Sequence, residues 1–145
     1  MGHEVKLWSF SEDEKDLINN EHKCKFLPMA TMPENIFCTT NIEEAVKGSD
    51  MILHVTPSKF TRETIKKYKM YVEEQPIILC SKGFEADTLL TLEEVVHEEL
   101  PKSKIGVFTG PSHAEEVSVG IPTAIVIASQ SLDVQYLVQD TFMNE

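Results

Sequence analysis

Short apolar runs alternate with helix-forming segments along most of this chain, and that alternation limits its fold more than any other feature of the sequence. The clearest runs are Met51-Ile-Leu-His-Val55, Pro76-Ile-Ile-Leu-Cys80, Ile105-Gly-Val-Phe108 and Thr123-Ala-Ile-Val-Ile127. Runs that are short and apolar at nearly every position are typical of strands buried on both faces. Strands of this kind, separated by helices, predict a mainly parallel sheet with helices on both sides.

Two further strands and a set of helix starts complete the pattern. The strands are Glu4-Val-Lys-Leu-Trp8 and Ile36-Phe-Cys-Thr39. Capping boxes of the form Ser/Thr-x-x-Glu, which are typical of helix N-termini, begin at Ser11, Thr40, Thr91 and Ser112. The order of elements predicts an α/β fold of the Rossmann-like, doubly wound type.

Two more helices are predicted without a capping box. One follows Ser58 and has Phe60, Ile65, Tyr68 and Val72 on its apolar face. The other runs from Leu132 to Met143. Because no linker or low-complexity segment interrupts the pattern, we predict a single partial domain over residues 1–145.

Composition excludes several classes of function. The 145 residues carry 24 acidic and 13 basic side chains, so the net charge is −11 and non-specific binding to nucleic acid is not expected. The three cysteines, at 24, 38 and 80, lack the spacing of a metal site and fit reduced thiols in a cytoplasmic protein. No apolar run approaches the roughly 20 residues that span a membrane.

The glycine pattern is unusual for a dinucleotide-binding sheet. Such a sheet uses a GxGxxG turn between its first strand and first helix to bring the backbone to a pyrophosphate. None of the six glycines falls in that pattern, and Gly2-His-Glu-Val5 resembles a helix end that leads into a second strand. We therefore expect a fold that is incomplete at its N-terminus. In the usual order 3-2-1-4-5-6 the first strand is central, so its loss would expose two strand edges.

Two polar segments follow buried strands and carry the chemistry of the chain. Ser81-Lys-Gly83 comes after one strand, and Gly110-Pro-Ser-His-Ala-Glu-Glu-Val117 comes after the next. The carboxyl ends of parallel strands form the ligand-binding edge of open α/β sheets. A lysine, two glycines and a helix start at this edge predict a site for a small anion.

These segments belong to a longer ordered set that identifies a family. The set comprises Gly2-His-Glu-Val-Lys-Leu-Trp8, Phe26-Leu-Pro28, Pro33-Glu-Asn35, Thr39-Thr-Asn-Ile-Glu-Glu-Ala45, Val55-Thr-Pro-Ser58, Ser81-Lys-Gly-Phe-Glu85, Gly110-Pro-Ser-His-Ala-Glu-Glu-Val117 and Gly120-Ile-Pro-Thr123. The chain resembles the N-terminal, cofactor-binding domain of bacterial NAD(P)-dependent glycerol-3-phosphate dehydrogenases. The resemblance implies reversible hydride transfer between sn-glycerol 3-phosphate and dihydroxyacetone phosphate, with NAD or NADP as cofactor, supplying phospholipid synthesis.

The resemblance also implies roles for particular residues. Substrate contacts fall on Lys82, Gly110 and Ser112, and cofactor contacts fall on Phe10, Ser11, Phe26, Pro57, Lys82 and Ala114. Five of them have a plainer alternative: Lys82 as a solvated loop lysine, Ser112 as a helix cap, Phe10 and Phe26 as packing residues, and Pro57 as a strand terminator. His113 is not expected to act as a base, because no partner supports it. Residues 9–11 hold neither an acidic residue nor an arginine to select between NAD and NADP.

The family's catalytic base lies in a C-terminal helical domain that we expect to be absent here, so no catalytic residue is assigned within the chain. We expect a fragment without turnover, with small-molecule ligands and with a possible tendency to form homo-oligomers. Two alternatives stay open: a non-catalytic, self-associating Rossmann fragment, and part of another two-domain dehydrogenase acting on hydroxy acids or UDP-sugars.

Overall fold

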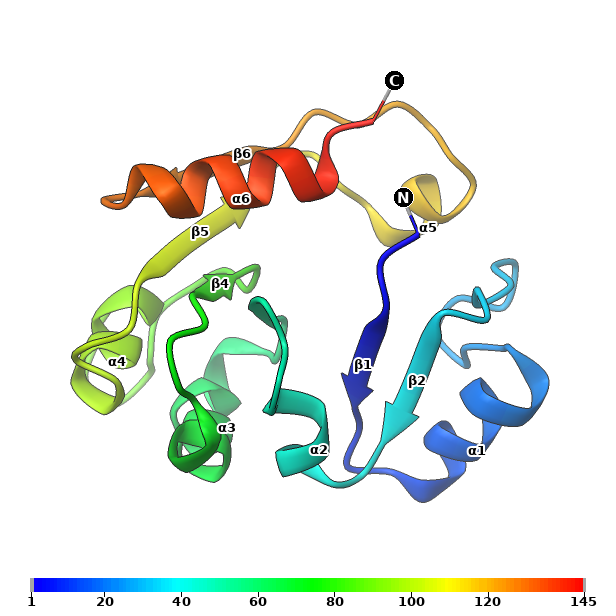
Figure 1. Cartoon of the computed structure of the whole chain (residues 1–145), viewed down its shortest axis with the longest axis horizontal. Coiled ribbons are helices and arrows are strands. Elements are labelled where there is room, and N and C mark those ends of the chain that lie inside the picture. Colours follow the sequence, from blue (N-terminus) through cyan, green and yellow to red (C-terminus); the bar gives the residue numbers. More distant parts are fainter. Residues whose placement is uncertain (1, 145) are drawn as a thin grey trace. The chain divides into compact units, whose positions relative to one another are not determined.

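A computed structural model describes residues 2–144 of the chain and divides them into two compact units. The first unit combines the residues up to Ala45 with Gly110–Ile125, and the second combines Val46–Thr109 with the residues from Val126 onward. The chain therefore leaves the second unit after one strand and returns to it at the next (Figure 1).

The first unit is built on a pair of parallel strands. Its elements are β1 (Val5–Trp8), α1 (Glu12–Glu21), β2 (Ile36–Thr39), α2 (Ile42–Val46), which ends at the start of the second unit, and α5 (Ala114–Ser118). Val5 pairs with Ile36 and Trp8 with Thr39. The Asn19 side chain on α1 bonds both backbone groups of Cys38, each at 2.8 Å, and so fixes the helix to the strand.

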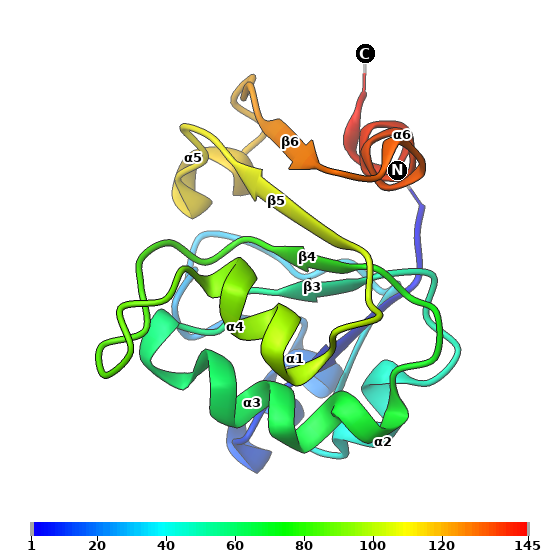
Figure 2. The ribbon, with the colours of Figure 1, turned by 90° about the vertical axis from the view of Figure 1, so that its left-hand side faces the viewer.

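The second unit is a four-stranded sheet with helices on both faces. Its strands, in spatial order, are β3 (Ile52–His54), β4 (Ile77–Leu79), β5 (Ile105–Thr109) and β6 (Val126–Ser129). The first three are parallel, and β6 is antiparallel to β5. Its helices are α3 (Thr61–Tyr68), α4 (Leu92–Glu99) and α6 (Leu132–Phe142), with short 3-10 turns η1 (Ser58–Phe60) and η2 (Lys69–Tyr71) flanking α3. Figure 2 shows α3 and α4 on one side of these strands and α6 on the other.

Strand alternation divides the core of the second unit between its two faces. Ile78 packs with Val134 and Val138 of α6. On the opposite face, His54 of β3 contacts Tyr68 of α3. Leu79, which pairs with His54 in the sheet, follows Ile78 in β4, and since successive side chains of a strand alternate, Leu79 points toward the α3 face. The fully apolar sequence of β4 therefore reflects its burial on both faces. The predicted Rossmann-like fold with a mainly parallel sheet is confirmed.

Gly106 makes room for the α6 side of this core. A Cβ atom there would lie 2.9 Å from Ile127 Cδ1 and 3.1 Å from both Ile78 Cδ1 and Val134 Cγ1. Glycine as the second residue of β5 thus lets these side-chain ends pack closely across the sheet, and a larger residue would make them shift.

Two of the predicted helix starts are confirmed. Ser11 caps α1 by accepting a hydrogen bond from the Glu14 N–H at 3.3 Å. Thr91 and Glu94 form a complete, reciprocal capping box at the start of α4.

The other two capping boxes are wrong. At α2 the Asn41 side chain accepts from the Glu43 N–H at 3.0 Å, while the Thr40 hydroxyl donates to Glu12 instead. At α5 the residue before the helix is His113, with no side-chain cap, so the helix begins two residues after Ser112.

Two other boundaries differ from prediction. The strand expected at residues 123–127 is displaced to β6, Val126–Ser129. Phe60, expected on the apolar face of α3, is 49 % exposed, and Thr61 is buried in its place. Phe60 belongs to the 3-10 turn η1, whose three residues per turn put it out of phase with the following α-helix.

Residues 2–144 contain neither a membrane-spanning helix nor a metal-binding cluster. In that range no helix is both long and apolar enough to cross a membrane. Nor do three or more His, Cys, Asp or Glu side chains gather there in a way that could hold a metal ion. The cysteines at 24, 38 and 80 are free thiols.

Candidate functional site

The carboxyl ends of β3 and β4 are joined by hydrogen bonds that extend beyond the sheet itself. The Cys80 N–H donates to the His54 carbonyl at 3.0 Å, and the Ser81 hydroxyl donates to the Thr56 carbonyl at 2.5 Å. These bonds hold the segment before Pro57 beside the segment before Lys82. Two of the predicted site residues are thus brought to one edge of the same sheet.

Lys82 is exposed at this edge and is followed by a glycine with a positive φ. Gly83 has φ +114°, a conformation that residues with a side chain rarely adopt, and a Cβ there would lie 3.3 Å from Ser58 Oγ. Within the described residues of its own unit, the Lys82 ammonium has no hydrogen-bond or ion-pair partner. Its charge is therefore open to a ligand.

The groups beneath this edge are uncharged at neutral pH. Burial lowers the pKa of His54 to about 4 and raises the pKa of the Cys80 thiol to about 11. No imidazolium competes with Lys82 for an anion, no thiolate competes with an anion for Lys82, and the strand end offers no thiolate nucleophile.

Gly110 follows the end of β5, but the structure gives it a packing role. A Cβ at Gly110 would lie 2.6 Å from the Ala124 carbonyl oxygen and 3.0 Å from Ile125 Cα. These are backbone atoms that cannot swing aside. The close approach of two chain segments is therefore sufficient to require glycine here, whether or not a ligand also approaches.

Ser112 is not used to cap α5. Its hydroxyl lies 3.5 Å from the Gly110 carbonyl, and the helix starts at Ala114. The side chains of Ser112 and Ala114 are exposed. The alternative interpretation of Ser112 as a helix cap is wrong, which leaves its hydroxyl available for another partner.

Phe10 and Ser11 lie at the turn between β1 and α1. Phe10 is 87 % exposed, so it is not a core residue. Ser11 caps α1, and its N–H donates to the Ser9 hydroxyl at 3.1 Å. The turn is held by its own side chains and presents the Phe10 ring outward.

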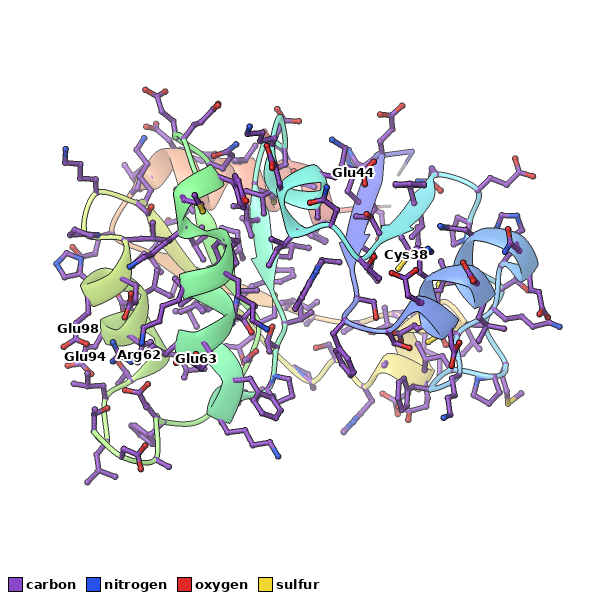
Figure 3. All side chains as sticks on the ribbon, turned by 90° about the horizontal axis from the view of Figure 1, so that it is seen from below. Cys38, Glu44, Arg62, Glu63, Glu94 and Glu98 are labelled. Atoms are coloured by element: carbon purple, nitrogen blue, oxygen red, sulfur yellow. The ribbon has the colours of Figure 1, made fainter. Side chains whose placement is uncertain are left out.

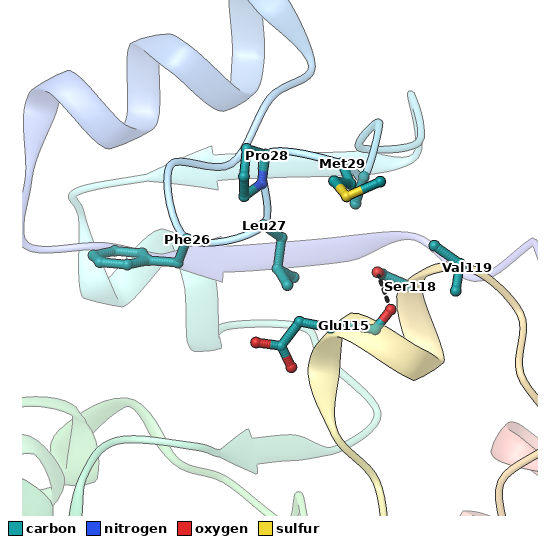
Figure 4. A pocket seen from close by; sticks show the side chains of 8 residues that line it. Phe26, Leu27, Pro28, Met29, Glu115, Ser118 and Val119 are labelled. Atoms are coloured by element: carbon teal, nitrogen blue, oxygen red, sulfur yellow. Dashed lines mark hydrogen bonds between the residues drawn. The ribbon is translucent and has the colours of Figure 1, made fainter.

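Phe26 borders a pocket of about 220 Å³ within the first unit (Figure 4). The pocket is formed by the loop after α1 and by one side of α5; its lining residues are Phe26, Leu27, Pro28, Met29, Ala30, Glu115, Ser118 and Val119. Phe26 is 75 % exposed at its rim. The lining is mostly apolar, as is common for sites that take a flat ring.

Of the predicted site residues, Phe26 alone lines this pocket, and Ser112 and Ala114 at the start of the neighbouring helix do not. Met29 and Val119 also line it and were not predicted. The only local feature that could have indicated Met29 is its apolar side chain in an irregular segment between Pro28 and Pro33. The predicted site residues thus fall into two groups: Phe10, Ser11, Phe26, Gly110, Ser112 and Ala114 in the first unit, and Pro57 and Lys82 in the second.

This fold, with polar loops at the carboxyl ends of its parallel strands, defines the class of Rossmann-like α/β domains. A sequence model described as the NAD-dependent glycerol-3-phosphate dehydrogenase N-terminus matches residues 1–135. The chain belongs to that family.

Curated relatives and solved structures agree with this membership. The chain is 41 % identical to glycerol-3-phosphate dehydrogenase (NAD(P)+) of Agathobacter rectalis and 40 % identical to that of Bacillus velezensis, over 99 % of its own length in each case. It spans 44 % and 43 % of those two proteins, less than half their length. The crystal structure of glycerol-3-phosphate dehydrogenase from Coxiella burnetii has a TM-score of 0.91, with 28 % identity over 98 % of this chain and 44 % of that one.

Proposed function

We propose that this chain is the cofactor-binding domain of an NAD(P)-dependent glycerol-3-phosphate dehydrogenase. In the complete enzyme, the hydride on C2 of sn-glycerol 3-phosphate passes to the nicotinamide, a base takes the hydroxyl proton, and dihydroxyacetone phosphate is formed. The reverse reaction supplies glycerol 3-phosphate for phospholipid synthesis. The observation that carries the proposal is the family match over residues 1–135.

The substrate side of the proposal rests on Lys82, Gly110 and Ser112. The Lys82 ammonium, exposed after β4 and without a partner in its own unit, suits a phosphate or a carbonyl oxygen that gains negative charge during reduction. Ser112 contributes a hydroxyl that α5 does not use. The base is proposed to lie outside residues 1–145, in the part of the relatives that this chain does not span.

The proposed cofactor contacts rest on exposed apolar side chains. Phe10, Phe26 and the pocket beside α5 suit the planar rings of a dinucleotide, and Ala114 and Pro57 offer small or rigid walls. The bound cofactor would supply the hydride acceptor. Residues 2–144 contain no GxGxxG turn, so within them no glycine turn serves the pyrophosphate. We therefore expect millimolar affinity for NADH and leave the choice between NADH and NADPH to measurement.

The remaining partners are proposed on composition. A net charge of −11 favours small-molecule ligands over nucleic acid. Three free thiols fit a cytoplasmic location.

Calorimetric titration of the chain with NADH, NADPH and dihydroxyacetone phosphate tests the proposal. We expect weak binding of each class of ligand and a loss of dihydroxyacetone phosphate binding in Lys82→Ala. Lys104→Ala is the matched control, because Lys104 is an exposed lysine that precedes β5 at the opposite edge of the sheet. Equal effects of the two substitutions would count against the role of Lys82. In a steady-state assay with dihydroxyacetone phosphate and NADH, appreciable turnover would contradict the placement of the base outside the chain.

A further inference from the structure

The loop between β4 and α4, which carries Lys82, is fixed on both sides of that lysine. On one side the Ser81 hydroxyl bonds the Thr56 carbonyl. On the other side the Glu85 N–H donates to the Leu90 carbonyl and the Leu89 N–H donates back to the Glu85 carbonyl, both at 2.9 Å. Glu85 therefore closes a compact turn three residues after the lysine.

The Glu85 carboxylate is held in turn by Arg62 of α3. Arg62 Nε and Nη2 donate to its two oxygens at 2.7 and 2.8 Å, which is a two-point fork. The Thr88 hydroxyl adds a third bond at 2.6 Å. The side chains of Arg62 and Glu85 are only 20 % and 16 % exposed, so this pair is better protected than an ordinary surface ion pair.

Arg62 also reaches two carboxylates at the end of α4, and Figure 3 labels one of them, Glu98, beside Arg62. Its Nη2 donates to Glu98 at 2.8 Å and its Nη1 to Glu99 at 3.0 Å. Lys69 is a second cation on Glu99, at 2.9 Å. One guanidinium thus joins α3, α4 and the loop between β4 and α4.

The charges in this cluster show how strongly the loop depends on Arg62. Hydrogen bonds from Arg62, followed by the bond from Thr88, lower the pKa of Glu85 to about 2. Without the guanidinium, three carboxylates would share the site with the ammonium groups of Lys69, which pairs with Glu99, and of Lys66, which acts on Glu85 and Glu99 without a hydrogen bond to either. Repulsion among the carboxylates would then weaken the hold of the two helices on Glu85, which lies on the loop and not on a helix.

We propose that Arg62 is a positioning residue: through Glu85 it holds the loop that presents Lys82, so that a phosphate-bearing ligand meets a lysine already in place. The inference rests on the proposed function in one respect, namely that Lys82 contacts the ligand. Holding the loop in advance removes the ordering cost that binding would otherwise carry. Loosening it should weaken binding by about tenfold, because the loop and the lysine side chain would then have to be ordered when the ligand binds.

Three variants of the full chain separate this role from general stability. Glu85→Gln breaks the fork from the loop side, and Arg62→Lys keeps the charge but cannot form the fork. Glu98→Gln is the matched control: it removes the same charge and another partner of the same guanidinium, but Glu98 lies on α4 and not on the loop.

Hydrogen exchange measures the loop directly and requires no ligand. We expect the Glu85 and Leu89 amides to exchange about tenfold faster in Glu85→Gln and Arg62→Lys, and at the original rate in Glu98→Gln. The Leu100 amide, which donates within α4 to Val96, should be unaffected in all three. Unchanged exchange at Glu85 and Leu89 would overturn the proposal, whatever the function of the chain. Thermal midpoints of the three variants identify any that fail to fold.

Titration with dihydroxyacetone phosphate then tests the consequence for binding. Affinity should fall about tenfold in Glu85→Gln and stay unchanged in Glu98→Gln. A faster-exchanging loop with unaltered affinity would overturn the positioning role. If the unsubstituted chain binds no dihydroxyacetone phosphate, that result counts against the proposed function, and the exchange rates alone then decide whether Arg62 holds the loop.

Discussion

At the scale of single residues, His54 is the most unusual group in the second unit. Its side chain is 3 % exposed, Nδ1 lies 3.4 Å from the Tyr68 hydroxyl, and Nε2 has no hydrogen-bond partner within residues 2–144. Burial lowers the pKa of His54 from 6.5 to about 4. The imidazole is therefore neutral in the folded protein under conditions where an unfolded chain would begin to charge it.

This depressed pKa predicts acid sensitivity. As the pH falls below 6.5, the unfolded chain takes up a proton at His54 before the folded chain does, so the free energy of unfolding falls until the pH reaches about 4. The full effect of this group is about 3 kcal/mol. Urea denaturation between pH 7 and pH 5 should show the early part of the fall, and His54→Leu should reduce it. An identical pH dependence in the variant would refute the assignment. The pKa of Glu85 is also lowered, but its contribution to the free energy of unfolding is lost mainly as the pH falls from 4.5 to about 2.

Residue roles that depend on local sequence could be predicted, and those that depend on distant contacts could not. Lys82 was predicted at a strand end because the apolar run before it fixes that end. The requirement for glycine at position 110 arises from Ala124 and Ile125, and the partners of Arg62 lie 23 to 37 residues further along the chain. No local pattern carries information about such pairs.

At the scale of elements, the helix starts show what a capping motif can and cannot predict. In the Thr91 box, the side chains of Thr91 and Glu94 bond each other and each other's backbone N–H. The Thr40 box failed because Glu12, 28 residues away, takes the Thr40 hydroxyl at 2.6 Å and Asn41 supplies the cap. The motif therefore predicts the presence of a helix better than it predicts the capping residue.

The Thr91 cap gives a test at this scale. Thr91→Ala removes the acceptor of the Glu94 N–H and one of the donors to the Glu94 carboxylate, and should lower the free energy of unfolding by about 1 kcal/mol. Ser131→Ala is the control, because Ser131 precedes α6 without a side-chain cap bond. Its cost should stay within about 0.5 kcal/mol. Equal losses in chemical denaturation of the two variants would mean that the capping box does not stabilise α4.

At the scale of the whole molecule, the sheet order leaves strand edges without partners. Among residues 2–144, β1 is hydrogen-bonded to β2 alone and β3 to β4 alone. In β3, the Ile52 N–H and the His54 carbonyl bond toward β4. The backbone groups of Leu53 therefore face away from β4, at an edge that can pair with another chain.

This edge predicts self-association of the 145-residue chain. We expect light scattering after size-exclusion chromatography to show oligomers whose share grows with protein concentration. Leu53→Pro should suppress them, because proline removes an edge N–H that no bond to β4 uses. A thermal midpoint near that of the unsubstituted chain would show that the variant is folded. A monomer at every concentration, or undiminished association of the variant, would contradict the prediction.

The pairing of Thr109 with Val126 has a consequence for protein engineering. These cross-strand partners bracket residues 110–125, so the two ends of that excursion lie side by side, and the approach of Gly110 to Ala124 closes its base further. Residues 110–125 could be removed and β5 and β6 joined by a short Asn-Gly turn, so that the second unit would be formed by one uninterrupted stretch of chain. Exchanging residues 110–125 among family members would likewise transfer a segment that contains one helix, α5, without changing the strands β5 and β6 that flank it.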